Sequence, residues 1–272
     1  MLHVIQAIIL GIVEGITEFL PISSTGHLIL TQKLLGFKDH HDLYTVVIQV
    51  GAIAAVMWFY REDLWKKTVG LFRRQPEALN FWKIIIIATI PAGIIGLALD
   101  KALEKFTTPL VIAISLIFGA IVLWIVDNKP ARTTELATPL ENISAKKALL
   151  VGLGQCVAMV PGISRSGATI VSGLAVGLNR PTATALSFYL SIPVLLLASA
   201  YKLAKYHAEI PNITGGYTAL FVGLLVSFIT ALLAVNWLLR YISSHNFRPF
   251  AIYRFIAGIV VLLLIALKIL PS

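Results

Sequence analysis

The first apolar stretch of the chain, residues 4–30, is interrupted in its middle by Pro21-Ile-Ser-Ser-Thr-Gly-His27. A second apolar stretch, residues 148–178, is interrupted in the same way by Pro161-Gly-Ile-Ser-Arg-Ser-Gly167. Each half is only about ten residues long, whereas a helix needs about 20 residues to cross the hydrocarbon core of a bilayer. Both stretches are therefore predicted to be broken, re-entrant helices whose loops lie at membrane depth.

The composition places the whole chain in a membrane. Its 272 residues are 58% apolar and 13% charged, with a mean hydropathy of +0.87, while soluble proteins carry roughly 25% charged residues. This balance excludes a soluble domain, intrinsic disorder and nucleic-acid binding of the usual kind, despite the net charge of +9. The single Cys156 excludes a disulfide framework and a multi-cysteine metal site. The N-terminus has no basic leader, so we expect the first helix to remain in the mature protein.

The two interrupted stretches correspond to each other at a constant offset of 141 residues. The matching pairs are Ala7 and Ala148, Gly11 and Gly152, Glu14 and Gln155, Ile22 and Ile163, Ser23 and Ser164, and Gly26 and Gly167. A weaker match, of Leu116-Ile-Phe-Gly119 with Phe255-Ile-Ala-Gly258, extends the repeat toward the C-terminus.

Six further apolar stretches are long enough to cross a bilayer. They cover residues 43–60, 84–99, 109–126, 185–201, 217–239 and 250–267. Three follow each broken helix, and an odd number of crossings inverts the second half relative to the first. The predicted fold is a single all-α integral membrane domain over 1–272, an inverted repeat of about 1–140 and about 141–272. Each half is a broken re-entrant hairpin followed by three transmembrane helices.

Basic residues collect in alternate loops, as the positive-inside rule requires. One set of loops holds Arg61, Lys66, Lys67, Arg73, Arg74, Lys129, Arg132, Lys146, Lys147, Arg240 and Arg248. The other set holds Lys33, Lys38, Lys101, Lys105, Lys202 and Lys205. The loops at 61–80, 128–147 and 240–249 are therefore assigned to the cytoplasm, which places both termini outside and brings the two broken loops together near the middle of the membrane.

Glu14 and Glu18 are the first candidates for chemistry, because acidic side chains in apolar segments are costly and usually functional. They lie four residues apart and share one helix face. Two carboxylates in that position repel each other unless a divalent cation or a shared proton lies between them. The alternative is that both hydrate a water-filled crevice.

The two loops carry the features of an anion site. Pro21 is expected to break the first helix, and Ser23 or Ser24 can cap a new helix that starts near Thr25. Ser164 and Ser166 can do the same in the second half, and the free N–H groups at such helix starts bind anions. Plain helix capping without a ligand explains the serines, but it leaves Arg165 unexplained.

Arg165 needs an anionic partner, and its planar guanidinium suits phosphate or carboxylate. An ion pair with Glu14 or Glu18 is the alternative. His27 lies three residues after Ser24, which is the spacing of a base beside a hydroxyl nucleophile, although a lone histidine is more often structural. Gln49 lies in a spanning helix, where interhelical hydrogen bonding or a place in the same cavity would explain it. Arg254, Asn236 and Tyr189 are interpreted as structural.

At these residues the chain resembles the undecaprenyl-pyrophosphate phosphatase family, also called the bacitracin-resistance proteins. The resemblance runs essentially from end to end. It is carried by Glu14-Gly-Ile-Thr-Glu-Phe-Leu-Pro-Ile-Ser-Ser-Thr-Gly-His27 and by Pro161-Gly-Ile-Ser-Arg-Ser-Gly-Ala-Thr169, two long signatures in the right order.

The resemblance implies a bacterial inner-membrane hydrolase that converts undecaprenyl pyrophosphate to undecaprenyl phosphate and orthophosphate, with Mg²⁺ or Ca²⁺, at a site open to the periplasm. That reaction recycles the lipid carrier of peptidoglycan synthesis and confers bacitracin resistance. The resemblance also implies a role for each residue. Glu14 and Glu18 are implied to form the acidic, metal-holding motif, Ser24 to be the nucleophile, His27 to be its proton-transfer partner and Arg165 to bind pyrophosphate. We assign substrate binding to Ser23, Thr25, Gly26, Ser164, Ser166, Gly167, Thr169 and Gln49.

Other functions remain open. Lipid phosphatases related to acid phosphatases need a His and an Asp after their arginine motif, and no such pair follows Ser164-Arg165-Ser166. A lipid-phosphate transporter or flippase would use the same anion site and the same repeat, but it needs no nucleophile. A purely structural membrane protein gives no reason for the buried charges. The apolar outer surface leaves room for a homodimer, and membrane lipids and the polyprenyl substrate are the expected partners.

Overall fold

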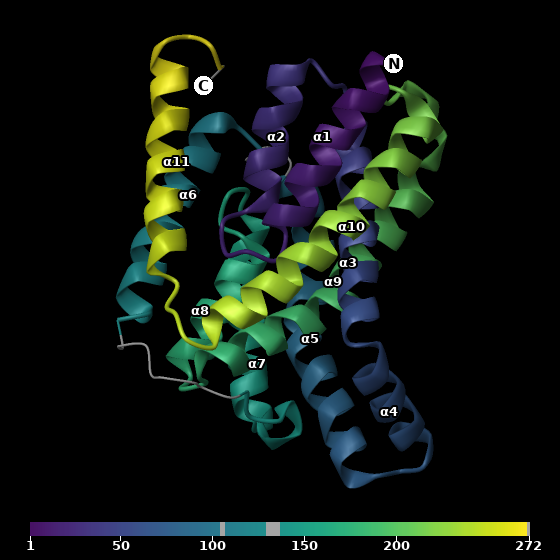
Figure 1. Ribbon diagram of the computed structural model, residues 1–272, viewed down its shortest axis with the longest axis vertical. Coiled ribbons are helices and arrows are strands. Elements are labelled where there is room, and N and C mark those ends of the chain that lie inside the picture. Colours follow the sequence, from purple (N-terminus) through teal and green to yellow (C-terminus); the bar gives the residue numbers. More distant parts are fainter. Residues whose placement is uncertain (104–106, 129–136, 271–272) are drawn as a thin grey trace.

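The computed structural model describes residues 1–103, 107–128 and 137–270, and the regular secondary structure of this part of the chain is entirely helical (Figure 1). Its α-helices are α1 (Leu2–Thr17), α2 (Ser24–Leu35), α3 (Leu43–Phe59), α4 (Arg61–Phe72), α5 (Pro76–Leu103), α6 (Pro109–Val126), α7 (Ala145–Gln155), α8 (Arg165–Ala175), α9 (Arg180–Tyr206), α10 (Gly216–Ile242) and α11 (Arg248–Ala266). Short 3-10 turns lie at η1 (His40–Asp42), η3 (Leu140–Asn142), η4 (Cys156–Met159) and η5 (His207–Asn212).

Six of these helices are long and apolar enough to cross a membrane, which confirms the predicted polytopic all-α fold. They are α3, α5, α6, α9, α10 and α11. The prediction was wrong at residues 61–80, which were expected to be a loop. This segment contains α4 and the start of α5. Polar residues end an apolar stretch but do not end a helix, and the acidic Glu62 and Asp63 in the first turn of α4 favour its N-terminus.

The two interrupted stretches are broken helices of the same construction. α1 ends at Thr17 and α2 begins at Ser24, while α7 and η4 are followed by α8 from Arg165. Ser23 caps α2 by accepting a hydrogen bond from the Gly26 N–H, and Ser164 caps α8 by accepting one from the Gly167 N–H.

Both capping serines have the same unusual backbone conformation. The φ angle is 74° at Ser23 and 75° at Ser164, in a region that residues other than glycine rarely adopt. The sequence offered Ser23 or Ser24 as the N-cap of α2, and the structure has Ser23 there. The N-cap of α8 is Ser164, which lies 141 residues after Ser23. The inversion of one half relative to the other stays a prediction.

Helices of the two halves pack against each other rather than forming separate bodies. α1 and α3 pack on α10, α6 packs on α11, α5 packs on α7, and α3 packs on α9. The loops of the broken helices are held together at the centre of this bundle, where the Ser166 hydroxyl donates a hydrogen bond of 2.8 Å to the carbonyl of Leu20. The fold therefore brings two segments 141 residues apart to one place.

Both termini lie at one end of the molecule, and α4 lies at the other end (Figure 1). The α4 end carries Arg61, Lys66, Arg73 and Arg74 on its exposed surface. Lys105, Lys129 and Arg132, which were part of the basic-residue comparison, lie outside the described residues.

Candidate active site

A cavity of about 560 Å³ lies beside the two loops. Its inner end is lined by Glu18, Ser24, Ser164 and Arg165, and its walls come from α3, α5 and α9. The cavity continues to Asp42 at the start of α3 and to Tyr201 and Lys202 in the last turns of α9. Thr107, just before α6, also lines this part. It therefore leads from the buried loops toward the end of the molecule that carries both termini (Figure 1).

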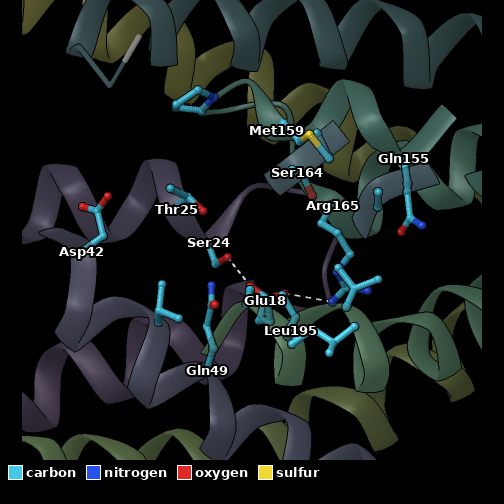
Figure 2. Close-up of a pocket in the computed structure, with 18 of the residues that line it drawn as sticks. Glu18, Ser24, Thr25, Asp42, Gln49, Gln155, Met159, Ser164, Arg165 and Leu195 are labelled. Atoms are coloured by element: carbon cyan, nitrogen blue, oxygen red, sulfur yellow. Dashed lines mark hydrogen bonds and ion pairs between the residues drawn. The ribbon is translucent and has the colours of Figure 1, made fainter. Parts of the chain in front are cut away.

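Glu18 is the centre of the polar network in this cavity (Figure 2). Its Oε2 accepts a hydrogen bond from the hydroxyl of Ser24. Its Oε1 accepts one of 2.9 Å from Nη2 of Arg165. One carboxylate thus joins a residue of the first loop to a residue of the second, and the hydroxyl of Ser24 already has a proton acceptor.

Arg165 is held from two sides. In addition to the ion pair with Glu18, its Nη1 donates a hydrogen bond of 2.8 Å to the carbonyl of Ser187 on α9. The hydroxyl of Ser187 accepts a hydrogen bond of 2.6 Å from Thr169. Arg165 therefore forms the ion pair that the sequence left as an alternative, and its partner is Glu18. The Arg165 side chain is still 12% exposed, and it lines the cavity.

Glu14 lies one helical turn before Glu18, whose N–H donates to the Glu14 carbonyl at 2.9 Å. Its side chain is fully buried, and neither carboxylate oxygen has a hydrogen-bond partner among the described residues. An unpartnered buried carboxylate is strongly unfavourable unless it binds a cation or a proton. This observation fits the divalent cation that was predicted between Glu14 and Glu18.

The cation would need ligands beyond these two carboxylates. No group of three or more His, Cys, Asp or Glu side chains is placed to hold a metal in the part of the chain that the structure describes. Mg²⁺ is commonly bound through one or two carboxylates together with substrate phosphates. Glu18 lines the cavity, whereas Glu14 is buried next to it and does not line it. The two carboxylates fit a cation only if phosphate oxygens of a ligand complete its coordination.

The predicted contact between His27 and Ser24 is wrong. The Nδ1 of His27 lies 2.7 Å from the carbonyl oxygen of Ser23, which can only accept, so Nδ1 carries the proton and donates. Its Nε2 then accepts from the hydroxyl of Tyr253 on α11, also at 2.7 Å. The two rings are stacked at 5.6 Å between centroids. These bonds direct the imidazole away from Ser24 and toward the backbone of the first loop.

The other predicted binding residues divide into two groups. Ser23, Thr25, Gln49 and Ser164 line the cavity together with Ser24, so Gln49 takes the cavity position rather than only a structural one. The remaining ones lie behind the cavity wall and shape the loops: Gly26, Ser166, Gly167 and Thr169.

Sequence reasoning missed three residues that hold this site. Ser187 is a serine in an apolar helix without any distinguishing neighbour, and no sequence signal identifies it. Tyr253 gives no signal either. Arg254 did give one, because it is a charged residue inside an apolar segment, but it was interpreted as structural. Its side chain contacts both loops.

The fold and the cavity define a polytopic membrane protein with a charged internal site built from two broken helices. The family model described as "Bacitracin resistance protein BacA" matches residues 7–260. The chain therefore belongs to this bacitracin resistance protein family, as the sequence resemblance indicated.

Similar proteins agree with this assignment. The chain is 46% identical over 267 residues to "Undecaprenyl-diphosphatase 2" of Rhodospirillum rubrum, covering 96% of this chain and 95% of the relative. It is 45% identical over 262 residues to "Undecaprenyl-diphosphatase" of Polaromonas naphthalenivorans, covering 95% and 94%. It is 42% identical over 266 residues to "Undecaprenyl-diphosphatase" of Persephonella marina, covering 96% and 99%.

Proposed function

We propose that this protein hydrolyses undecaprenyl pyrophosphate to undecaprenyl phosphate and orthophosphate, and that it thereby confers bacitracin resistance. The observation that carries the proposal is the arrangement around Glu18, which places a hydroxyl, a carboxylate and a guanidinium side by side in a membrane cavity. The names of relatives that align over nearly the full chain support the substrate.

The groups in the cavity, and Glu14 next to it, have complementary roles in this reaction. Arg165 and the first backbone N–H groups of α2 and α8 bind the phosphate oxygens, because helix starts and arginine both favour anions. Glu14 and Glu18 would hold a divalent cation, Mg²⁺ or Ca²⁺, whose chemistry is to neutralise the pyrophosphate charge. The apolar walls of the cavity, which include Leu97 of α5 and Leu197 of α9, receive the polyprenyl end of the substrate.

Ser24 is the nucleophile in the covalent route. Its Oγ forms a bond to the distal phosphorus, the bridging P–O bond breaks, and undecaprenyl phosphate leaves. The hydroxyl proton passes to Glu18, which already accepts it as a hydrogen bond. A water molecule then attacks the phosphoserine, the Oγ–P bond breaks, and orthophosphate leaves with the oxygen and the protons of that water. Glu18 returns its proton to Oγ of Ser24. Direct attack by water, with Glu18 as the base, uses the same residues.

His27 has a supporting role in this scheme. It holds the carbonyl of Ser23, the residue directly before the nucleophile, and is itself held by Tyr253. Proton transfer between His27 and Ser24, which the family resemblance implies, would first require the imidazole to leave these two partners.

The site opens to the periplasmic side of the bacterial inner membrane in this proposal. The support is the excess of basic residues in the loops at the α4 end, while the cavity leads to the opposite end. A homodimer through the lipid-facing surface stays a prediction.

Phosphate release from undecaprenyl pyrophosphate by the purified protein in detergent tests this function. Release that stops on addition of EDTA and resumes with Mg²⁺ or Ca²⁺ is expected. A lipid-phosphate flippase is the alternative, and it predicts no release, together with movement of the labelled lipid across vesicles that contain the protein. Phosphate release by the unaltered protein separates the two, because transport of the lipid needs no hydrolysis.

A further inference from the structure

Arg254 brings a positive charge from α11 to the centre of the bundle. Its side chain is 1% exposed, and its guanidinium donates hydrogen bonds to four backbone carbonyls. The acceptors are Pro21 at 3.1 Å, Gly162 at 3.2 Å, Ser115 at 3.2 Å and Leu116 at 3.4 Å. Within the described part of the chain, no ion pair joins Arg254 to a carboxylate.

Two of these carbonyls occupy equivalent places in the two broken helices. Pro21 lies two residues before the cap Ser23, and Gly162 lies two residues before the cap Ser164. They are separated by the same 141 residues that relate the two halves. One guanidinium therefore binds the corresponding carbonyl of each loop, Nη1 to the first and Nη2 to the second.

The surrounding chain leaves room for this guanidinium and for little else. A methyl group on Gly119 of α6 would overlap with Nη2 of Arg254, and one on Gly167 of α8 would lie 3.0 Å from Nη1. A buried cation is costly, and a buried charge often adds less stability than a well-packed apolar residue of similar volume. Packing alone therefore does not explain why an arginine occupies this position.

We infer that Arg254 is a positioning residue for the reaction, one that fixes the separation between the loop of Ser24 and the loop of Arg165. This inference rests on the proposed hydrolysis. Arg254 does not line the cavity, and it acts through the backbone of the two loops. Because a displacement of 1 Å in a reacting group can lower turnover about 100-fold, loss of this bridge is expected to lower kcat by about that factor and to change KM little.

Arg254→Ala and Gly119→Ala test the inference in complementary ways. The first removes the guanidinium, and the second keeps it but displaces it, so the second still decides if the first does not fold. Arg180→Ala is the matched control, since Arg180 is also buried but pairs with Asp127 outside the cavity.

The measurements are kcat and KM per folded molecule, with and without methylguanidinium. Both test variants are expected to lose kcat, and methylguanidinium is expected to restore part of it in Arg254→Ala alone. The Arg180→Ala control is expected to lose stability with kcat per folded molecule unchanged. Unaltered kcat in folded Gly119→Ala or Arg254→Ala would overturn the inference.

A distance measurement keeps this result separate from the proposed function. Spin labels on Thr25→Cys and Ala158→Cys, in a Cys156→Ser background, report the separation of the two loops without any turnover. A broader distribution in Arg254→Ala is expected, and an unchanged distribution would overturn the inference. If the unaltered protein releases no phosphate, the proposed function fails, and the spin-label distances still decide whether Arg254 joins the loops.

Discussion

Glu18→Gln is the substitution with the most direct consequences, because both oxygens of this carboxylate accept hydrogen bonds. Oε2 accepts from the Ser24 hydroxyl and Oε1 from Nη2 of Arg165. The glutamine amide has one oxygen and one NH₂ group, and NH₂ cannot accept. With its oxygen toward Arg165, the amide donates from NH₂ to Oγ of Ser24, and the Ser24 hydroxyl then loses the group that accepts its proton.

The expected loss of activity follows from the role of Glu18 as the proton acceptor for Ser24. General bases contribute about 10²–10⁴-fold to turnover, so kcat is expected to fall by that factor. The ion pair is also broken, and removing one partner of a buried pair costs about 3–5 kcal/mol. The lower end applies here, since Arg165 keeps its hydrogen bond to Ser187 and 12% of its side chain is exposed.

Phosphate release from undecaprenyl pyrophosphate, measured at equal amounts of folded protein, is the assay. Glu18→Asp is the matched control, because it keeps the charge but shortens the side chain, and it is expected to retain more activity than Glu18→Gln. A folded Glu18→Gln protein with the kcat of the unaltered protein would show that Glu18 is not the base.

The overall architecture could be predicted because bilayer physics leaves few choices. Six apolar stretches became six spanning helices, since backbone polar groups in lipid must be satisfied within the segment. The breaks near Pro21 and Pro161 were predictable from length, because apolar halves of about ten residues are too short to cross the bilayer.

The sequence predicted which residues form the site better than it predicted how they contact each other. The sequence identified Glu18, Ser24 and Arg165, because buried charge is costly and must find partners. It could not tell that Glu18 binds both of the others. The prediction for His27 was wrong because helical spacing gives neighbours on one helix, whereas Tyr253, a distant residue on α11, decides where the ring points.

Three further substitutions have distinct expected results. Ser24→Ala should abolish turnover and the trapping of labelled phosphoserine if the covalent route operates, whereas near-normal turnover would leave direct water attack. Glu14→Gln removes a buried charge whose oxygens have no partner among the described residues, so it should raise the melting temperature while shifting the Mg²⁺ midpoint for phosphate release to higher concentration. An unshifted midpoint would separate Glu14 from the cation. Burial raises the pKa of Asp39, in the loop before α3, above its ordinary value of 3.8. The folded protein therefore holds this proton to higher pH than the unfolded chain, and the unfolding free energy should fall as pH rises from about 3.8 through the raised pKa. Asp39→Asn should flatten that part of the curve in thermal unfolding, and an unchanged slope would contradict the assignment.

The ratio of kcat/KM for undecaprenyl pyrophosphate between the unaltered protein and Arg165→Ala tests most directly whether hydrolysis takes place where the two broken helices meet. Removing one donor that stabilises developing charge costs about 10²–10³-fold in turnover, and a loss of at least this size is predicted here because Arg165 also binds the ground-state anion. A folded Arg165→Ala protein with unchanged kcat/KM would place the chemistry elsewhere in the molecule.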